Sequence, residues 1–532
     1  MLHKTNYKDL IILVFLAISF FSVKLWINDE PLISNDSCQY FSIADNALKG
    51  NIGYTSIIHF DSERSHAVIP APVTTFPIGY SLILASISSL GFSLYHAGII
   101  INVICLMFFV LFLVKFTKIF ELNKSEKIFL YAWIIGNSTL YLLSVKPLSE
   151  FLFTFITTFS ILLFIISDIK EKNRDSYIYL VLIANVLVGL SCWVRYAGLF
   201  LFVTITVFYL LKCLMDPSRD RFITFSCTSV SAVIIFVGLL RNHILVGTWK
   251  GGNTVSSHAN IFDVIIGFVK SVFHVTLGDQ VALSIGIFEI LISISILILC
   301  VYLAKFIITK NKLHHVNTLI LLSLYIVIYC AALIYTAINS PVSIESTRLF
   351  FPVLIPTGMV ISLITINLRL NNKNLNHQKI ISASLIVFSI SYSVINANNH
   401  LHINENTSKY RYVSQILKHG EENSDIVKWI NSHIKPDDDN LAANYGQMTG
   451  LVLQNNMLSL VSRRFSKIRW NHDVTKKTFN LFNIKYLILF RQPNNNILKE
   501  NTFLMNLSAI REIPDWLTIT KYNGNVVIYR LK

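Results

Sequence analysis

Residues 97–114 read AGIIINVICLMFFVLFLV, a stretch without a single charged side chain. A helix needs about 20 apolar residues to cross the hydrocarbon core of a bilayer. Runs of the same kind, with almost no charge, recur at 10–21 and 282–301. Because their apolar residues are continuous and do not alternate with polar ones, these runs predict helices and not the strands of a barrel. The sequence therefore predicts a polytopic helical membrane protein.

Composition and charge support a membrane protein and argue against a nucleic-acid-binding protein. Of the 532 residues, 53% are hydrophobic and only 14% are charged, which is too apolar for an ordinary soluble protein. The net charge of +15 is that of a strongly basic chain. The basic residues, however, gather in short loops at the ends of the apolar runs, and no basic patch is interleaved with aromatic residues. We therefore expect a lipid bilayer as partner and no nucleic acid.

The apolar runs and the basic loops together predict a topology. We place eleven spans, at about 9–28, 94–116, 127–144, 150–167, 177–193, 197–214, 222–240, 281–305, 316–338, 349–367 and 379–396. Lysine and arginine cluster before the first span and in every second loop after it, so these segments are predicted to be cytoplasmic. This expectation describes a multi-pass protein of the cell (inner or plasma) membrane, with a cytoplasmic N-terminus.

The remaining segments are then extracytoplasmic. They are a long first loop at 29–93, an intermediate loop at 241–280, three short turns and a tail from about 397. Within the first loop, 76–90 is apolar but short and begins Phe76-Pro77-Ile78-Gly79. We expect this segment to lie along the interface or dip into it, because a further span here would invert the charge pattern downstream.

The tail changes abruptly to polar sequence rich in Asn and Lys. Its patterns predict helices at 410–418 and 426–433 and strands at 440–445 and 484–490. A hairpin is predicted from 516–522 and 526–531, which flank Asn523-Gly524. The predicted fold class is thus an all-α polytopic membrane domain at 1–396, whose first loop carries interfacial helices, plus a small extracytoplasmic α/β domain at 397–532.

Two acidic residues at the extracytoplasmic surface are candidates for chemistry. Asp36 follows the first span by a few residues, where a carboxylate can accept a proton as a general base. The alternative is that Asn35 or Asp36 caps the helix that runs on to Leu48. Glu150 stands in the turn between the third and fourth spans, where the start of a helix favours an anion. A carboxylate that enters an apolar span is costly, however, and tends to be functional.

Three arginines lie on the same predicted side. They are Arg195 between the fifth and sixth spans, Arg241 after the seventh, and Arg348 at the start of the tenth. Guanidinium groups bind phosphate oxygens in a bidentate manner, as a lipid phosphate at a membrane surface would require. Each arginine alone could simply extend its charge to the interface. Three of them on one side, together with two acids, favour a phosphate-binding site.

These residues stand in motifs that resemble the GT-C fold membrane glycosyltransferases, whose relatives include the protein O-mannosyltransferases and the aminoarabinose transferases. The first loop carries Asp36-Ser37-x-x-Tyr40, Gly53-Tyr54 and Phe76-Pro77-x-Gly79-Tyr80. Similar motifs follow in the family's order over about residues 10–360, namely Leu148-Ser149-Glu150, Arg195-Tyr196-Ala197-Gly198 and Arg241-Asn242-x-x-Leu245-x-Gly247.

The resemblance implies an enzyme that moves a hexosyl or pentosyl group from a polyprenyl-phosphate-linked donor to an extracytoplasmic acceptor, which is a glycan, lipid or protein of the cell envelope. It implies Asp36 as catalytic base and Glu150 as a supporting residue of the site. Substrate binding is expected of Tyr40, Tyr54, Arg195, Arg241 and Arg348, with Arg348 and Arg241 preferred for the donor phosphate. Many members have an acidic pair where Asn35 precedes Asp36 here, so Asp29 and Glu30 remain alternative bases.

Alternative functions are a transporter or flippase of a lipid-linked substrate, and a ligase or polymerase of lipid-linked glycans. Transporters usually place charged residues near the bilayer midplane and often show repeated halves, whereas the polar residues here cluster at one surface. No resident cofactor is expected. The sequence shows no metal-ligand spacing, and a requirement for a divalent cation is left open.

Overall fold

The protein is described by a computed structural model. It covers residues 7–27, 32–59, 64–169, 174–249, 251, 260–277, 315–340, 347–371, 375–401, 409–419, 424–435, 439–462, 468–492 and 495–532. Among these residues, nine helices are long and apolar enough to cross a membrane. They include α1 (Tyr7–Ile27), α4 (Leu94–Ile119), α7 (Ser149–Ile169), α8 (Arg174–Val194) and α9 (Gly198–Met215). The others are α10–α11 (Arg219–Ser226 and Thr228–Val246), α14 (Val316–Asn339), α15 (Phe351–Asn371) and α16 (Leu375–Leu401).

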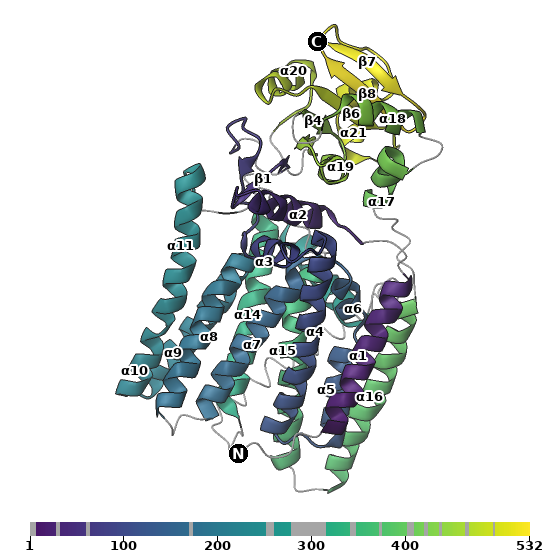
Figure 1. Ribbon diagram of the computed structural model, residues 1–532. Coiled ribbons are helices and arrows are strands. Elements are labelled where there is room, and N and C mark those ends of the chain that lie inside the picture. The colour runs from purple at the N-terminus through teal and green to yellow at the C-terminus, as the bar shows by residue number, and fades with distance from the viewer. Residues whose placement is uncertain are drawn as a thin grey trace.

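These helices stand side by side in a bundle that carries a smaller α/β unit at one end, referred to below as the sheet end (Figure 1). The predicted fold class, a helical membrane domain plus a small α/β domain, is therefore confirmed. The predicted span at 281–305 lies outside the described residues. A further helix, α12 (Ile261–Leu277), falls in the segment predicted to be a loop.

The third predicted span, 127–144, is two helices and not one. α5 (Lys124–Ile135) ends at Gly136, and α6 (Ser138–Ser144) begins after Asn137. The Asn137 side chain caps α6 by accepting from the Leu140 N–H at 3.2 Å. It also donates to the Tyr392 hydroxyl of α16 at 2.6 Å. Asn137 therefore fixes the break, within the short polar segment Gly136-Asn137-Ser138-Thr139.

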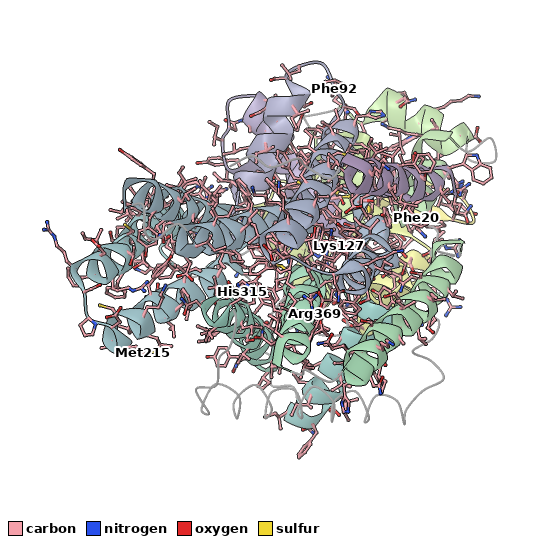
Figure 2. All side chains as sticks on the ribbon, turned by 90° about the horizontal axis from the view of Figure 1, so that it is seen from below. Phe20, Phe92, Lys127, Met215, His315 and Arg369 are labelled. Carbon is pink, nitrogen blue, oxygen red and sulfur yellow. The ribbon has the colours of Figure 1, made fainter. Side chains whose placement is uncertain are left out.

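The helix ends predicted to be cytoplasmic meet at the end of the bundle opposite the sheet. Asp168 of α7 pairs with Lys212 of α9 and accepts a hydrogen bond from Asn317 of α14 at 3.0 Å. Arg369 of α15 lies 3.2 Å from Glu126 of α5. Figure 2 looks along the bundle from below and labels Arg369 among these helix ends. The predicted grouping of these ends on one side is thus reproduced by contacts between helices distant in sequence.

The first loop builds a layer between the bundle and the sheet. α2 (Asn35–Leu48) and α3 (Gly79–Ser88) lie across the ends of the membrane helices (Figure 1). At 10 residues, α3 is about 15 Å long, which is too short to cross the hydrocarbon core. Tyr40 of α2 packs edge-on against Tyr80 of α3, with ring centroids 4.9 Å apart. The expectation that 76–90 is not a span is therefore confirmed.

A six-stranded sheet forms the α/β unit, with strand order β2-β5-β4-β6-β8-β7. Its strands are β2 (Ile57–Ile58), β4 (Asn440–Ala443), β5 (Asn456–Ser459), β6 (Tyr486–Phe490), β7 (Leu517–Tyr522) and β8 (Val526–Leu531). The flanking helices are α17 (Lys409–Ser414), α18 (Ser424–His433), α19 (Gly446–Leu453), α20 (His472–Leu481), α21 (Asn496–Glu500) and α22 (Thr502–Ser508). A second, two-stranded sheet pairs β1 (Tyr54–Thr55) with β3 (Ala71–Pro72).

Most of the elements predicted for the tail are present, and the β7–β8 hairpin forms as expected around Asn523-Gly524. Two strands of the six-stranded sheet, β5 in the tail and β2, were not predicted. β2 belongs to the first loop and pairs in parallel with β5, with Ile57 opposite Met457. The sheet therefore joins the first loop to the tail. The division of the chain at residue 396 stays a prediction.

Candidate functional site

The start of α2 is capped by serines. The Ser34 hydroxyl accepts from the Ser37 N–H, and the Ser37 hydroxyl accepts from the Ser34 N–H, both at 3.2 Å. Asp36 stands in the first turn but is not the cap, so the alternative reading of this residue as a helix cap is wrong. Its carboxylate is left for contacts outside the helix.

The Asp36 carboxylate contacts Arg348, whose Nη1 lies 2.6 Å from Asp36 Oδ2. Arg348 belongs to a 3₁₀ turn, η2 (Thr347–Phe350), that leads directly into α15. The same Nη1 lies 3.5 Å from Glu150 Oε1, so Arg348 stands between the two acids. About a third of the Arg348 side chain is exposed, and the Asp36 side chain is 21% exposed. This part of the site is therefore open to a ligand.

Glu150 lies deeper. It is the second residue of α7, only 1% exposed, and its Oε1 lies 2.7 Å from Arg195 Nη1. Neither carboxylate oxygen accepts a well-aligned hydrogen bond from the described residues, so the contacts of Glu150 with the arginines are ionic. A buried carboxylate is tolerated when opposite charge compensates it. Two guanidinium groups do so here, and the four side chains together carry no net charge.

Tyr40 and Ser149 complete this cluster. The Tyr40 hydroxyl lies 2.7 Å from Ser149 Oγ, which also accepts a hydrogen bond from Arg195 Nη1 at 3.1 Å. Burial raises the pKa of Tyr40 well above its usual value, so its hydroxyl keeps its proton. Ser149 was missed in the sequence reasoning. The only signal for it was its place directly before Glu150, in a motif that resembled the family.

Arg241 and Tyr54 are not part of this cluster. Arg241 donates from Nη2 to the Gly53 carbonyl and from Nη1 to the Val73 carbonyl, both at 3.0 Å. Tyr54 pairs with Pro72 in the two-stranded sheet. In the part of the chain that the structure describes, no ion pair or hydrogen bond joins either residue to Asp36 or Glu150. The structure thus brings together five of the seven predicted residues, Asp36, Tyr40, Glu150, Arg195 and Arg348.

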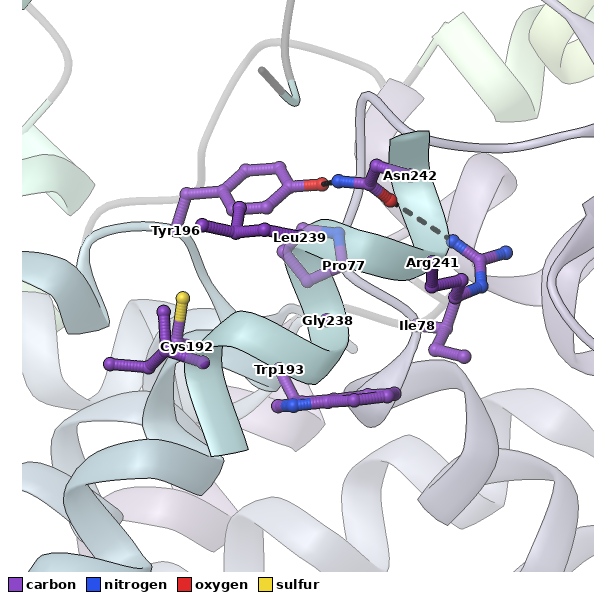
Figure 3. Close-up of a pocket in the computed structure, with 10 residues that line it drawn as sticks. Pro77, Ile78, Cys192, Trp193, Tyr196, Gly238, Leu239, Arg241 and Asn242 are labelled. Atoms are coloured by element: carbon purple, nitrogen blue, oxygen red, sulfur yellow. Dashed lines mark hydrogen bonds between the residues drawn. The ribbon is translucent and has the colours of Figure 1, made fainter. Parts of the chain in front are cut away.

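The surroundings of Arg241 indicate a structural role. Asn242 accepts from Arg241 Nη1 and donates to the Tyr196 hydroxyl, as Figure 3 shows. Tyr196 in turn donates to the Thr74 carbonyl at 2.6 Å. The cavity beside these residues measures about 20 Å³, which is room for about one water molecule. Arg241, Asn242 and Tyr196 therefore hold the first loop against the bundle.

The tail contacts the helix that carries Asp36. Gln447 of α19 donates to the Asn35 carbonyl at 3.3 Å, and the Cys38 thiol lies 3.2 Å from the Met448 sulfur. These residues were also missed from sequence, where no motif marks them. As for metals, the described residues hold no group of three or more His, Cys, Asp or Glu side chains that could bind an ion.

Comparisons with known proteins bear on the fold. No family model and no curated protein matches the sequence. Among solved structures, the chain is similar to ArnT from Cupriavidus metallidurans in the apo state, with 10% identity, a TM-score of 0.59 and coverage of 99% of this chain and 98% of that chain. The same protein bound to undecaprenyl phosphate gives 9% identity and a TM-score of 0.58, covering 98% and 97%.

A second similar protein is the oligosaccharyltransferase AglB from Archaeoglobus fulgidus, in complex with an inhibitory peptide and a dolichol-phosphate. It gives 10% identity and a TM-score of 0.54, over 93% of this chain and 71% of that chain. At such identities the likeness concerns architecture, and it confirms the expected fold. The chain has the GT-C fold of polytopic membrane glycosyltransferases.

Proposed function

We propose that this protein is an integral membrane glycosyltransferase, which moves a sugar from a polyprenyl-phosphate-linked donor to an extracytoplasmic acceptor. The observation that carries the proposal is the cluster of Asp36, Arg348, Glu150 and Arg195 at the sheet end of the bundle. Two similar structures, ArnT and AglB, contain undecaprenyl phosphate and dolichol-phosphate respectively. A lipid phosphate is the ligand that such a cluster on this fold would recognise.

In this proposal Arg348 and Arg195 bind the donor phosphate. Each guanidinium has five N–H donors, and only some of them face the carboxylates. Glu150 is the buried counter-ion that holds both arginines in place before the donor arrives. The arginines then stabilise the negative charge that grows on the phosphate as the sugar bond breaks. Arg241, preferred from the sequence, is engaged by backbone carbonyls and is not assigned to the donor.

Asp36 acts as the base. It accepts the proton of the acceptor's nucleophile, whose electron pair forms the new bond to the anomeric carbon. The bond between that carbon and the phosphate oxygen breaks, and its electron pair stays on the polyprenyl phosphate. Asp36 is suited to this role because it is partly exposed and lies beside a phosphate-binding arginine. The alternative bases Asp29 and Glu30 lie outside the described residues.

The position of the charges favours an enzyme over a transporter. The cluster joins the first turn of α2, the start of α7, the α8–α9 turn and the 3₁₀ turn before α15, all at the sheet end (Figure 1). Intramembrane charges of transporters lie typically near the midplane. With the N-terminus in the cytoplasm, as the basic loops predict, the cluster faces the extracytoplasmic side.

The test uses membranes of cells that lack the protein as the source of both lipid-linked sugar and acceptor. Purified protein is added, and transfer of radiolabelled sugar out of the lipid-linked pool is followed. Asp36→Asn should abolish transfer. Asp45→Asn is the matched control, since Asp45 lies on the same helix and, among the described residues, its carboxylate pairs at the surface with Lys49. Unchanged transfer by folded Asp36→Asn protein would show that Asp36 is not the base.

A further inference from the structure

A small cavity lies between α2 and the short strands of the first loop. It measures about 20 Å³, and its polar lining comes from Gln39, Thr55, His59 and Thr75. Gln39 follows Asp36 by three residues on α2, so the two side chains project from neighbouring positions on one face of the helix. The cavity therefore lies next to the proposed base.

Gln39, one of the lining residues, carries an unused donor. The residue is only 2% exposed, and its amide nitrogen Nε2 has no hydrogen-bond partner among the described residues. A buried donor left unpaired is unfavourable, because it has lost its hydrogen bonds to water and gained none in the protein. Such groups are rare in folded proteins, and each calls for an explanation. A ligand oxygen that enters the cavity would satisfy the Gln39 donor.

The polar groups of the cavity are uncharged. Besides the amide of Gln39, two are the hydroxyls of Thr55 and Thr75. The fourth is the imidazole of His59, whose pKa is lowered to about 4 by burial, so that it is neutral at pH 7. His59 Nδ1 also lies 2.8 Å from the Ser459 hydroxyl of β5, which fixes the ring against the tail. A carboxylate entering here would find no compensating positive charge in the lining.

We infer that this cavity receives the reacting hydroxyl of the acceptor, and that Gln39 donates a hydrogen bond to an oxygen of an uncharged, hydroxyl-bearing acceptor. The inference rests on the proposed glycosyltransferase function. The volume of the cavity admits one hydroxyl group, so the rest of the acceptor stays outside the cavity. The hydroxyl proton passes to Asp36, the hydroxyl oxygen bonds to the anomeric carbon, and the polyprenyl phosphate leaves with the electrons of the broken bond. The product is an O-glycoside.

The experiment replaces Gln39 by Leu and varies the acceptor and donor concentrations separately in the membrane assay. One lost hydrogen bond should raise the acceptor concentration for half-maximal rate about three- to tenfold. The dependence on donor should not change. Gln39→Leu should fold as well as the wild type, because it removes an unpaired donor. Gln39→Met fills a similar volume with an unbranched side chain and serves as the second variant if the leucine protein does not fold.

Asn46→Leu is the matched control. Asn46 is another buried amide on α2, but it is paired, donating to the Ser42 carbonyl at 2.8 Å and to the Ser56 hydroxyl at 3.1 Å. Its replacement should lower the melting temperature and leave the acceptor dependence unchanged. Absence of transfer by the wild-type protein would overturn both proposals. Transfer with an unchanged acceptor dependence in the Gln39 variants, or a product linked through nitrogen, would overturn the cavity assignment alone.

Discussion

Asp36 and Arg348 are in direct contact, with 2.6 Å between Oδ2 and Nη1, although they stand at opposite ends of the membrane part of the chain. The pair joins the first turn of α2 to the turn that leads into α15. In the proposed mechanism, a donor phosphate that binds Arg348 competes with Asp36 for the same guanidinium. Donor binding would therefore weaken the ion pair of Asp36 with Arg348 when the carboxylate is needed as a base.

Arg348→Lys should lower transfer by about 10²-fold, chiefly through weaker stabilisation of the leaving phosphate. Lysine keeps the charge but loses the planar fork that binds two oxygens at once. The measurement is the rate of transfer as a function of donor concentration. Arg369→Lys, at the opposite end of α15, is the control and should leave transfer unchanged. Equal rates for Arg348→Lys and wild type would remove Arg348 from the donor site.

Glu150→Gln should destabilise the protein by about 3–5 kcal/mol, because it leaves the buried side of Arg195 without its counter-charge. The melting temperature in detergent measures this loss. In the double variant Glu150→Gln with Arg195→Gln the uncompensated charge is gone, so part of the stability should return. A single variant as stable as the wild type would mean that the ionic contact contributes nothing to the fold.

Much of the fold could be predicted because a bilayer imposes simple rules on a sequence. Continuous apolar runs predicted the helices, and the basic loops sorted their ends, which meet as expected through pairs such as Arg369 with Glu126. The hairpin in the tail followed from the local turn chemistry of Asn523-Gly524. The break in the third span has a local signal, because Gly136 and Asn137 are typical of a helix end and of the cap of a new helix. It was missed because the span was predicted from the apolar residues before and after this short polar segment.

The candidate site was predicted less completely. Asp36, Glu150 and Arg348 could be grouped because they share a side of the membrane. The same rule also admitted Arg241, since position alone does not distinguish a guanidinium that binds phosphate from one that binds backbone carbonyls. The contacts of the tail with the first loop, such as Ser459 with His59, depend on strand pairing between segments distant in sequence. No local pattern encodes them.

The stability of the protein should fall as the pH drops from about 6.5 towards 4, and His59 should account for part of the change. Burial lowers the pKa of His59 to about 4, so the unfolded chain binds a proton in this range that the folded chain does not. The stabilisation is present above the unfolded pKa and is lost through this window, by at most about 3 kcal/mol. Melting temperatures at pH 7 and pH 5 measure it.

His59→Gln should show a smaller difference between the two pH values than the wild type. His96→Gln is the control, because His96 is exposed and, among the described residues, its ring has one hydrogen bond with Ser93 and one aromatic contact with Tyr95 near the start of α4. It should keep the wild-type difference. An equal pH dependence in His59→Gln and wild type would assign the acid sensitivity to other groups.

Gly53→Ala should destabilise the first loop more than Gly50→Ala does. Both glycines have positive φ, +80° at Gly53 and +90° at Gly50, so alanine strains the backbone at either position. A Cβ at Gly53 would in addition lie 2.1 Å from Arg241 Nη2, whereas no atom lies within 4 Å of a Cβ at Gly50. The difference between the two melting temperatures therefore isolates the contact with Arg241.

Combining Gly53→Ala with Arg241→Ala removes the clash and leaves only the backbone strain of the alanine. The cost of Gly53→Ala, measured against the Arg241→Ala background, should then fall to about 1 kcal/mol, close to the cost of Gly50→Ala in the wild type. A cost that is the same with and without Arg241 would mean that the guanidinium does not hold the Gly53 carbonyl. Arg241 would then lose its assigned role of fixing the first loop, and it would again be a candidate for binding the donor phosphate.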